Sequence, residues 1–449
     1  MKKYLTLLAL VCVALPAAAF DPLLTNKTAA PKGCIDKDAD KEELTLDDLI
    51  QISLCNNPTL SAGYMGVKAS EAGLGQARAQ YLPSVNLTGT GNITGTKVED
   101  GRYTQGEPYT GKAEASWLLF DFGGREARTS STRNYVDAVR YSYDASIQDT
   151  VLAVQTAYLN LLAAQESLVS AQASLDTYKQ SYEEAEKRYK LGMVSLSDKL
   201  QANTRYAQAQ LAVVQAENLI KQYRGALAIL INLPPDTPLQ LQKPVYGDDM
   251  IQIANDNIND LMQTAIKERA ELRAQQSTQQ AAKKDVTSAK TAMLPTISAT
   301  ASAAYNDNWK HSNPYTTNNS AGLLVTMPLF TGFSNTYQIK QASYKYHQAV
   351  ENTQALTLQV QNEVWRAYQN YKTALRSYEI SQSVLESAEE NHRVAFRYYE
   401  IGKGDILTLL SAVAQLADAR QNKITAFYSL LLSKASLYNE LIGFICLKL

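Results

Sequence analysis

The segment Tyr81-Leu82-Pro83-Ser84-Val85 occurs a second time in the chain, with closely similar residues, as Met293-Leu294-Pro295-Thr296-Ile297. In both copies a helical pattern precedes the segment and a strand-like alternation follows it. Proline disfavours helical geometry in the residue before it, so each helix is expected to end at the Leu-Pro step. The repeated segment therefore predicts two equivalent places at which a helix gives way to a strand.

Further matches extend this similarity over most of the chain. Matching residues are 212 positions apart up to the first strand-like segment and 210 apart from the second one onward, so the change falls between these segments, where a loop can absorb it. The matched pairs include Leu119-Phe120 with Leu329-Phe330, Ala157-Tyr158 with Ala367-Tyr368, and Arg188 to Gly192 with Tyr398 to Gly402. We predict two repeats, 45–232 and 257–443, a Pro-rich linker at 233–256 and a C-terminal tail at 444–449.

Each repeat is predicted to contain the same elements in the same order. Repeat one has a helix at 45–80, strands at 84–94 and 112–121, a long helix at 125–191 and a returning helix at 195–232. Repeat two has a helix at 257–292, strands at 296–305 and 320–330, a long helix at 334–401 and a returning helix at 405–443. The sequence therefore predicts an α plus β fold built from two helix–hairpin–helix halves.

The long helices carry a seam at every seventh position. Its residues are Ile147, Val154, Leu161, Leu168, Leu175, Tyr182 and Tyr189 in the first repeat, and Val364, Tyr371, Tyr378, Leu385, His392 and Tyr399 in the second. A sustained seven-residue seam indicates left-handed coiled-coil packing. At 1.5 Å per residue, each helix is expected to be on the order of 100 Å long, which no compact domain accommodates.

The N-terminus has the pattern of a secretory signal peptide. Lys2 and Lys3 precede an apolar run from Tyr4 to Leu15, and Ala17-Ala18-Ala19 supplies the cleavage site. We predict a signal peptide at 1–19 and an extended segment at 20–44. A transmembrane helix needs about 20 apolar residues, which neither this run nor any other stretch reaches. Any membrane insertion must therefore use strands.

Three cysteines remain once the signal peptide is removed: Cys34, Cys55 and Cys446. Export places them in an oxidising compartment, where disulfides persist. Because Cys34 and Cys55 flank the turn into the first helix, we predict a disulfide between them. Three buried thiols are the alternative.

The composition argues against chemistry and against nucleic acid. The 449 residues include 43 basic and 44 acidic side chains, a formal net charge of -1, without the basic excess of a nucleic-acid binder. The chain has only 3 His and 4 Cys, and no histidines have the spacing of metal ligands. No Ser/His/Asp or paired-carboxylate constellation stands out. We therefore expect a protein that is not an enzyme and that holds no metal or cofactor.

The predicted hairpins require an assembly. Four strands per chain cannot close a membrane barrel, because the smallest have about eight, and an open sheet edge cannot face lipid. Several chains must therefore pool their hairpins. Aromatic residues flanking the hairpins are expected at the membrane interface or in loops: Tyr103, Tyr109, Trp117, Tyr305, Trp309 and Tyr315.

Taken together, the signal peptide, the duplicated order, the Leu-Pro stops and Leu119-Phe120-Asp121-Phe122-Gly123-Gly124-Arg125 resemble the TolC-type outer-membrane efflux proteins. The resemblance covers about 45–443. It implies a homotrimer with a twelve-strand β-barrel in the outer membrane of a Gram-negative bacterium, continued by a twelve-helix coiled-coil tunnel across the periplasm.

The same resemblance implies the exit duct of a tripartite efflux or type I secretion system, exporting small molecules or proteins. Its partners would be a periplasmic adaptor (a membrane fusion protein), an inner-membrane transporter and outer-membrane lipid. The alternative is a periplasmic structural coiled-coil protein or adhesin without a pore.

The resemblance also places a periplasmic aperture at the turns after the long helices. Asp198 and Tyr399 match the family's aspartate and tyrosine at these turns, and we hypothesise that a link between them holds the aperture shut. The chain departs from the family where Gly404 replaces an arginine and where Thr408 and Ser411 replace two acidic residues. Lys403 and Asp405 are nearby charges that could substitute. As an alternative, Asp198 is only a charge favoured at a helix N-terminus.

Overall fold

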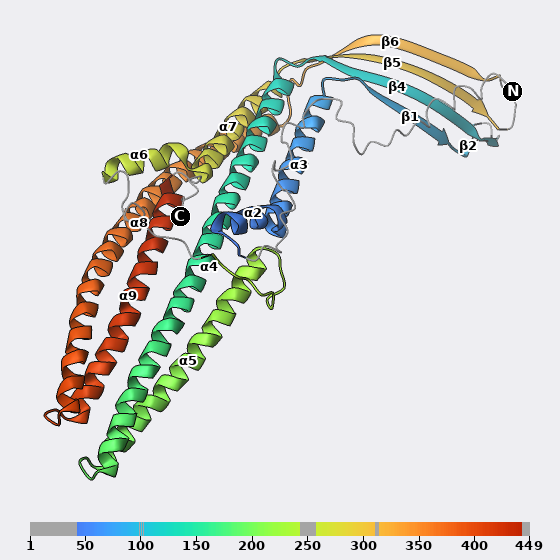
Figure 1. Cartoon of the computed structure of the whole chain (residues 1–449). Coiled ribbons are helices and arrows are strands. Elements are labelled where there is room, and N and C mark those ends of the chain that lie inside the picture. Colours follow the sequence, from blue (N-terminus) through green and yellow to red (C-terminus); the bar gives the residue numbers. More distant parts are fainter. Residues whose placement is uncertain are drawn as a thin grey trace. The chain divides into compact units, whose positions relative to one another are not determined.

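The computed structural model describes residues 43–97, 99, 101, 103–242, 257–309 and 314–441 (Figure 1). The predicted signal peptide 1–19, residues 20–42, residues 243–256 of the linker and the tail 444–449 lie outside the described residues. Repeat one contains α2 (Leu46–Asn56), α3 (Pro58–Ala79), β1 (Ser84–Gly91), β2 (Thr94–Lys97), β3 (Tyr103–Gly106), β4 (Pro108–Phe120), α4 (Gly124–Lys190) and α5 (Leu196–Leu230). Repeat two contains α6 (Ile258–Glu268), α7 (Ala270–Thr291), β5 (Thr296–Asn308), β6 (Thr316–Thr326), α8 (Ser334–Glu400) and α9 (Ile406–Leu441). The duplicated helix–hairpin–helix order is confirmed.

The two long helices, α4 and α8, have 67 residues each. The bounds expected from the heptads, 125–191 and 334–401, differ from the observed bounds by one residue at most at each end. At 1.5 Å per residue both helices are about 100 Å long.

The prediction of one continuous helix at 45–80 and another at 257–292 is wrong, because each is interrupted. The first breaks at Asn57, whose extended ψ of 119° is the geometry that the following Pro58 favours. The second breaks at Arg269, which has a ψ of 126° and no proline after it. The Arg269 guanidinium lies 2.5 Å from a Glu363 carboxylate oxygen and 3.0 Å from one of Glu440, so this break is accompanied by ion pairs to α8 and α9.

The strand bounds also need correction. The strand expected at 84–94 ends at Gly91, and Thr94–Lys97 instead pairs with Tyr103–Gly106 in a separate two-stranded sheet. The strand expected at 112–121 begins earlier, at Pro108, and the one expected at 296–305 continues to Asn308. The strand expected at 320–330 runs from Thr316 to Thr326, because Pro328 cannot donate a ladder hydrogen bond and the polar residues at its start hide the alternation.

The two hairpins form one antiparallel sheet with the order β1-β4-β5-β6. The central pairing joins the repeats, with Pro108 opposite Asn308 at one end and Phe120 opposite Ile297 at the other. Within the described residues, β1 and β6 each pair with one strand of this sheet only.

The repeats are not the compact units of the fold. One unit combines Met65–Arg140 with Ala274–Thr353 and contains the four-stranded sheet. The other takes the described residues of Pro31–Tyr64, Tyr141–Arg273 and Gln354–Leu449. Each unit therefore draws on both repeats, because the long helices pass from one unit into the other.

The heptad positions form the core of the second unit. Val154 and Leu161 of α4 are fully buried, as are their repeat-two equivalents Val364 and, almost completely, Tyr371. Tyr158 is buried beside them and its hydroxyl donates a hydrogen bond to the Gln242 carbonyl oxygen over 2.9 Å. The seam is thus buried in mid-helix, and this packing rather than intrinsic propensity stabilises the long helices.

Cys55 lies in α2 and is disulfide-bonded. Its predicted partner Cys34 lies outside the described residues, as does Cys446. The pairing of Cys34 with Cys55 therefore stays a prediction.

Replacing Leu161 with alanine is expected to lower the free energy of unfolding by about 2–5 kcal/mol, because a fully buried leucine leaves a cavity that its neighbours only partly fill. Denaturant unfolding followed by far-UV circular dichroism measures the change. Lys179→Ala, on the exposed surface of the same helix, is the matched control and should stay within about 0.5 kcal/mol of the parent. Equal effects of both substitutions would contradict a buried seam.

Candidate functional site

The strand register gives the four-stranded sheet two chemically different faces. Side chains of directly paired residues lie on the same face, and alternate residues of a strand share a face. The apolar face contains Val85, Leu87, Ala113, Ala115, Trp117, Ile297, Ala299, Ala301, Ala303, Ala321, Leu323 and Val325, and the polar residues Asp307, Thr317 and Asn319 join it only towards the loop end. The polar face contains Ser84, Asn86, Thr88, Thr90, Thr110, Lys112, Glu114, Ser116, Ser298, Thr300, Ser302, Asn306, Asn318 and Ser320, with Leu118, Ala304 and Leu324 as its apolar members. The apolar face continues across the β4–β5 pairing, so it belongs to the sheet and not to either hairpin alone.

Charges decide which face can meet lipid. Lys112 and Glu114 lie on the polar face near the middle of β4, with 2.6 Å between Nζ and Oε2. A lysine on the lipid face at mid-bilayer would cost about 2–4 kcal/mol. The polar face is therefore suited to water and the apolar face to hydrocarbon.

Aromatic side chains lie at the loop end of the strands. The Tyr109 and Tyr305 hydroxyls both donate hydrogen bonds to Asp307 Oδ2, over 2.8 and 3.0 Å. The Tyr305 ring stacks on Tyr315 at 5.5 Å, and the Tyr109 ring meets Trp309 edge-on at 6.0 Å. Amphipathic rings at one end of an apolar strand face are typical of a membrane interface.

Trp117 lies towards the opposite end of β4 from this cluster, and its Nε1 donates a hydrogen bond to the Tyr81 carbonyl oxygen over 2.9 Å. The side chain of Tyr103 lies outside the described residues.

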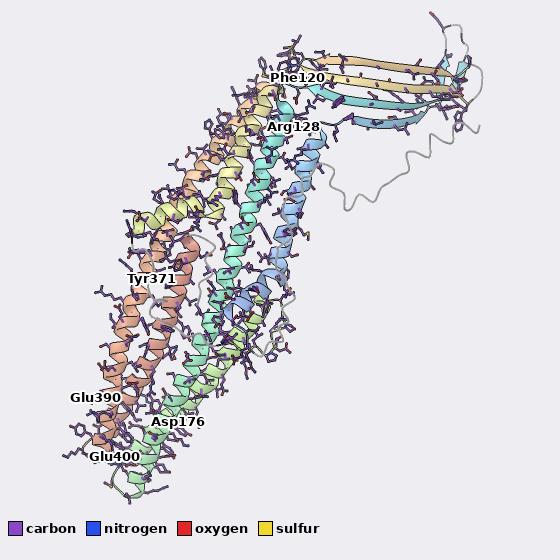
Figure 2. All side chains as sticks on the ribbon, turned by 45° about the horizontal axis from the view of Figure 1, so that its top comes forward. Phe120, Arg128, Asp176, Tyr371, Glu390 and Glu400 are labelled. Carbon is purple, nitrogen blue, oxygen red and sulfur yellow. The ribbon has the colours of Figure 1, made fainter. Side chains whose placement is uncertain are left out.

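A second group of aromatic residues lies at the corners where strands give way to long helices, and Figure 2 labels Phe120 at the first of these corners. Phe120 and Phe122 have ring centroids 4.7 Å apart, and Phe330 and Phe333 have theirs 5.5 Å apart; all four side chains are exposed. Phe122 and Phe333 adopt positive φ, 53° and 65°, which is costly for a residue with a Cβ. Both corners thus hold exposed phenylalanines, and Phe120, which is paired with Ile297, places one of them on the apolar face.

Arg125 fixes the first corner. Its guanidinium donates to the carbonyl oxygens of Leu118 and Leu119 over 2.6 and 2.9 Å and lies 4.8 Å from the centre of the Tyr81 ring. The side chain is buried, so the charge is held by these carbonyls and by Asp121, 3.7 Å away. Arg125 therefore ties the end of the strand to the start of α4.

At the far ends of the long helices, two turns have the same backbone geometry. Gly192 and Gly402 adopt positive φ, 71° and 77°, and each closes its helix by donating to the carbonyl oxygen three residues earlier. Met193 and Lys403 donate to carbonyl oxygens five residues earlier, over 2.8 and 2.9 Å. These are Schellman-type ends, for which glycine is the favoured residue.

The returning helices α5 and α9 begin with equivalent caps. In α5 the hydroxyl residue comes first and the aspartate three residues later, and in α9 the order is reversed. In α5, Asp198 Oδ2 accepts a hydrogen bond from the Ser195 backbone amide over 3.0 Å, and Ser195 Oγ accepts one from the Asp198 amide over 3.2 Å. In α9, the Asp405 carboxylate accepts hydrogen bonds from the Thr408 amide and hydroxyl, both over 2.8 Å. These bonds lower the pKa of Asp405. The structure thus supports a capping role for Asp198, Asp405 and Thr408.

The expected link between Asp198 and Tyr399 is not formed within the described chain. Tyr399 is 1% exposed, and its hydroxyl has no hydrogen-bond partner among the described residues. Arg188 covers its ring at 4.6 Å and donates to the Glu400 carbonyl oxygen over 2.6 Å. Burial raises the pKa of Tyr399. The contact between Arg188 and Tyr399, which sequence reasoning missed, therefore joins the ends of α4 and α8.

The remaining aperture residues are on the surface. Lys403 and Ser411 are exposed, and Ser411 lines a groove of about 780 Å³ between α5 and α9. Gly404 closes the second turn so tightly that an added Cβ would lie 3.1 Å from the Tyr399 backbone nitrogen. A larger residue at this position would have to shift the turn.

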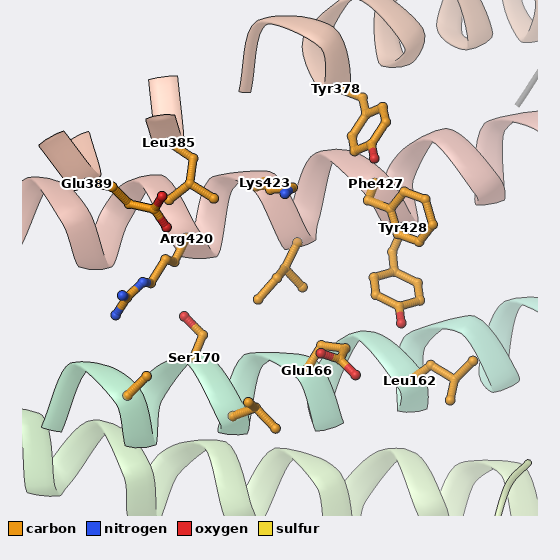
Figure 3. A pocket seen from close by; sticks show the side chains of 13 residues that line it. Leu162, Glu166, Ser170, Tyr378, Leu385, Glu389, Arg420, Lys423, Phe427 and Tyr428 are labelled. Atoms are coloured by element: carbon orange, nitrogen blue, oxygen red, sulfur yellow. The ribbon is translucent and has the colours of Figure 1, made fainter. Parts of the chain in front are cut away.

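A second groove, of about 620 Å³, lies between α4, α8 and α9 (Figure 3). Tyr378 and Phe427, with ring centroids 5.3 Å apart, occupy one end, whereas Glu389 and Arg420 lie towards the other. Burial raises the pKa of Tyr428 at the aromatic end. The groove thus has an aromatic end and a charged end, which suits packing or an amphipathic ligand more than catalysis.

The described parts of the chain contain neither a metal-binding cluster nor a membrane-spanning helix. No group of three or more His, Cys, Asp or Glu side chains there could hold a metal ion. None of the described helices is long and apolar enough to cross a membrane.

A sheet with one lipid-compatible face, continued by paired long helices, defines the class of outer-membrane channel proteins. The chain belongs to the outer membrane efflux protein family, whose model matches residues 49–233 and 261–442. Protein CyaE of Bordetella pertussis is 27% identical over 389 residues, covering 85% of this chain and 81% of the relative. Outer membrane protein TolC of Vibrio cholerae is 25% identical, covering 84% of this chain and 86% of the relative.

Solved structures show the same fold. The outer-membrane channel OprN superimposes with a TM-score of 0.78 at 19% identity, covering 89% of this chain and 90% of that one. The outer membrane protein VceC of Vibrio cholerae gives a TM-score of 0.76 at 19% identity, covering 88% and 95%. The protein is an outer-membrane channel-tunnel of efflux or secretion, and the comparisons do not support a structural coiled coil or adhesin without a pore.

The cap of α9 is expected to weaken in acid. Because the pKa of Asp405 is lowered from its usual 3.8, its stabilising contribution is present above that value and is lost as the pH falls through the lowered pKa. Hydrogen exchange of the Thr408 and Leu409 amides should accelerate over this range beyond the intrinsic pH effect. Asp405→Asn, which can cap without titrating, should remove the dependence. An unchanged dependence in this variant would contradict the role of Asp405.

Proposed function

We propose that three copies of this chain assemble into one duct, a twelve-strand barrel continuous with a twelve-helix tunnel, that serves as the exit of a tripartite efflux or type I secretion system. The observation that carries the proposal is the two-faced sheet, in which β1 and β6 pair with one strand each among the described residues. An unpaired strand edge is not tolerated in lipid, so other copies must supply the missing partners.

The size of the lumen favours three copies over two. Two copies would give eight strands, and a barrel of that size is just wide enough for side chains to fill it. Three copies give twelve strands and leave room for a wet interior lined by the polar face. The same three copies contribute α4, α5, α8 and α9 each, which supplies the twelve long helices.

Exposed apolar side chains on the long helices support association. Tyr344 and Leu358 of α8 are 72% and 60% exposed, and Leu211 and Val214 of α5 are 57% and 60% exposed. Residues 344 and 358 are two heptads apart on one stripe of α8. In this proposal neighbouring copies cover these exposed side chains.

The names of relatives indicate the kind of export system in which such a duct would work. One is named toluene efflux pump outer membrane protein TtgC, of Pseudomonas putida, and is 24% identical over 409 residues. By analogy, a periplasmic adaptor and an inner-membrane transporter would deliver small molecules or proteins to the helical end of the duct. We place the aperture at the two turns, where Lys403, Asp405, Thr408 and Ser411 are exposed, and Asp198 and Tyr399 belong to the same turns.

A pair of neighbouring arginine substitutions tests the proposal. Ala301→Arg places a charge on the apolar face of β5 and should reduce the amount of protein assembled in the outer membrane, because each copy pays about 2–4 kcal/mol near mid-bilayer. Thr300→Arg places the same charge on the polar face and should still assemble. Outer-membrane fractionation and planar-bilayer conductance measure both outcomes.

Wild-type protein and Thr300→Arg should give discrete channel openings in the bilayer. If Ala301→Arg assembles and conducts as well as Thr300→Arg, the apolar face does not meet lipid and the proposal fails.

A further inference from the structure

The polar face of the sheet carries one ion pair. Lys112 and Glu114 are two residues apart on β4, so both side chains lie on that face, and Lys112 Nζ is 2.6 Å from Glu114 Oε2. Neither is buried: the side chains are 43% and 47% exposed. Each charge is therefore in contact with whatever fills the space in front of the polar face.

Within the described strands of the sheet, no other charged residue lies on the polar face. The residues paired with Lys112 are Thr88 and Ala304, and those paired with Glu114 are Asn86 and Ser302. Among the four described strands, 84–91, 108–120, 296–308 and 316–326, the remaining charged residue is Asp307. Asp307 is paired with Tyr109 on the opposite face, at the loop end. There the hydroxyls of Tyr109 and Tyr305 both donate hydrogen bonds to its carboxylate.

We propose that Lys112 and Glu114 form the charge filter of the duct. The inference rests on the proposed function, because the polar face must line the lumen. Each copy then contributes one pair, and the copies together place a ring of lysines next to a ring of glutamates, two residues apart along the strand. Rings of charged side chains set the ionic preference of a pore, and low-dielectric walls concentrate their field.

Because the two charges are paired, we expect the wild-type filter to favour neither cations nor anions strongly. The lysine and glutamate fields offset each other for any ion that passes at a distance. A charged solute that touches the wall meets an opposite charge whichever sign it carries. The solutes recognised are therefore ionic groups, inorganic or organic, of either sign, and removing one partner should leave a filter for one sign.

Reversal potentials in planar bilayers under a potassium chloride gradient test the filter. Lys112→Gln should raise the potassium-to-chloride permeability ratio at least about threefold, the effect of one unscreened charge about 6 Å away in water. Glu114→Gln should lower the ratio by a similar factor. The double variant Lys112→Gln/Glu114→Gln should return to the wild-type ratio, and Lys290→Gln in α7 is a control at an exposed lysine outside the sheet.

A charge swap guards against misfolding of the single variants. Lys112→Glu combined with Glu114→Lys keeps the ion pair and should conduct with the wild-type ratio. The filter is wrong if the single variants open channels as often as the wild type and leave the permeability ratio unchanged. It is also wrong if both variants shift the ratio in the same direction. In either case the proposed duct stands. If the wild-type protein forms no channel, the proposed function fails and the filter fails with it.

Discussion

A β-strand edge has to be paired wherever it meets hydrocarbon, and this requirement governs the molecule. The sheet of β1, β4, β5 and β6 presents one apolar and one polar face, yet within the described chain its outer strands have one neighbour each. Curling four strands into a closed barrel is impossible, since known barrels need about eight or more. The sheet is therefore complete only in an assembly, and the faces decide what lies inside and outside it.

The two repeats share the backbone conformation of their turns and helix caps, although the side chains at equivalent positions differ. Both repeats keep the same turns and caps, but Ser195 and Asp198 stand where Asp405 and Thr408 stand in the second copy. Phe122 and Gly123 likewise correspond to Gly332 and Phe333, with positive φ at all four positions. The backbone conformations are conserved between the repeats, whereas hydrogen-bonding and aromatic groups exchange places.

Much of the architecture could be predicted from the sequence, because its signals are local. The heptad seam predicts the bounds of α4 and α8 to within one residue. The break at Asn57 also has a local signal, the Asn-Pro step, although the prediction of one continuous helix overlooked it. The break at Arg269 has no such signal and coincides with ion pairs to distant glutamates. At the turns, the Ser-x-x-Asp cap was readable, but the contact of Arg188 with Tyr399 joins residues 211 apart in sequence and needs the fold.

Cross-linking between β1 and β6 tests the closed assembly most directly. Asn86 and Ser320 lie on the polar face of the same sheet but are three strand spacings, about 14 Å, apart, too far for a disulfide within one chain. Cysteines at polar-face positions of β1 (Asn86 or Thr88) and β6 (Asn318 or Ser320) are expected to form intermolecular disulfides when oxidised in membranes. On a denaturing gel they should give a ladder that stops at three chains. If none of these cysteine pairs cross-links, or if the ladder continues beyond three chains, a sheet closed by three copies is contradicted.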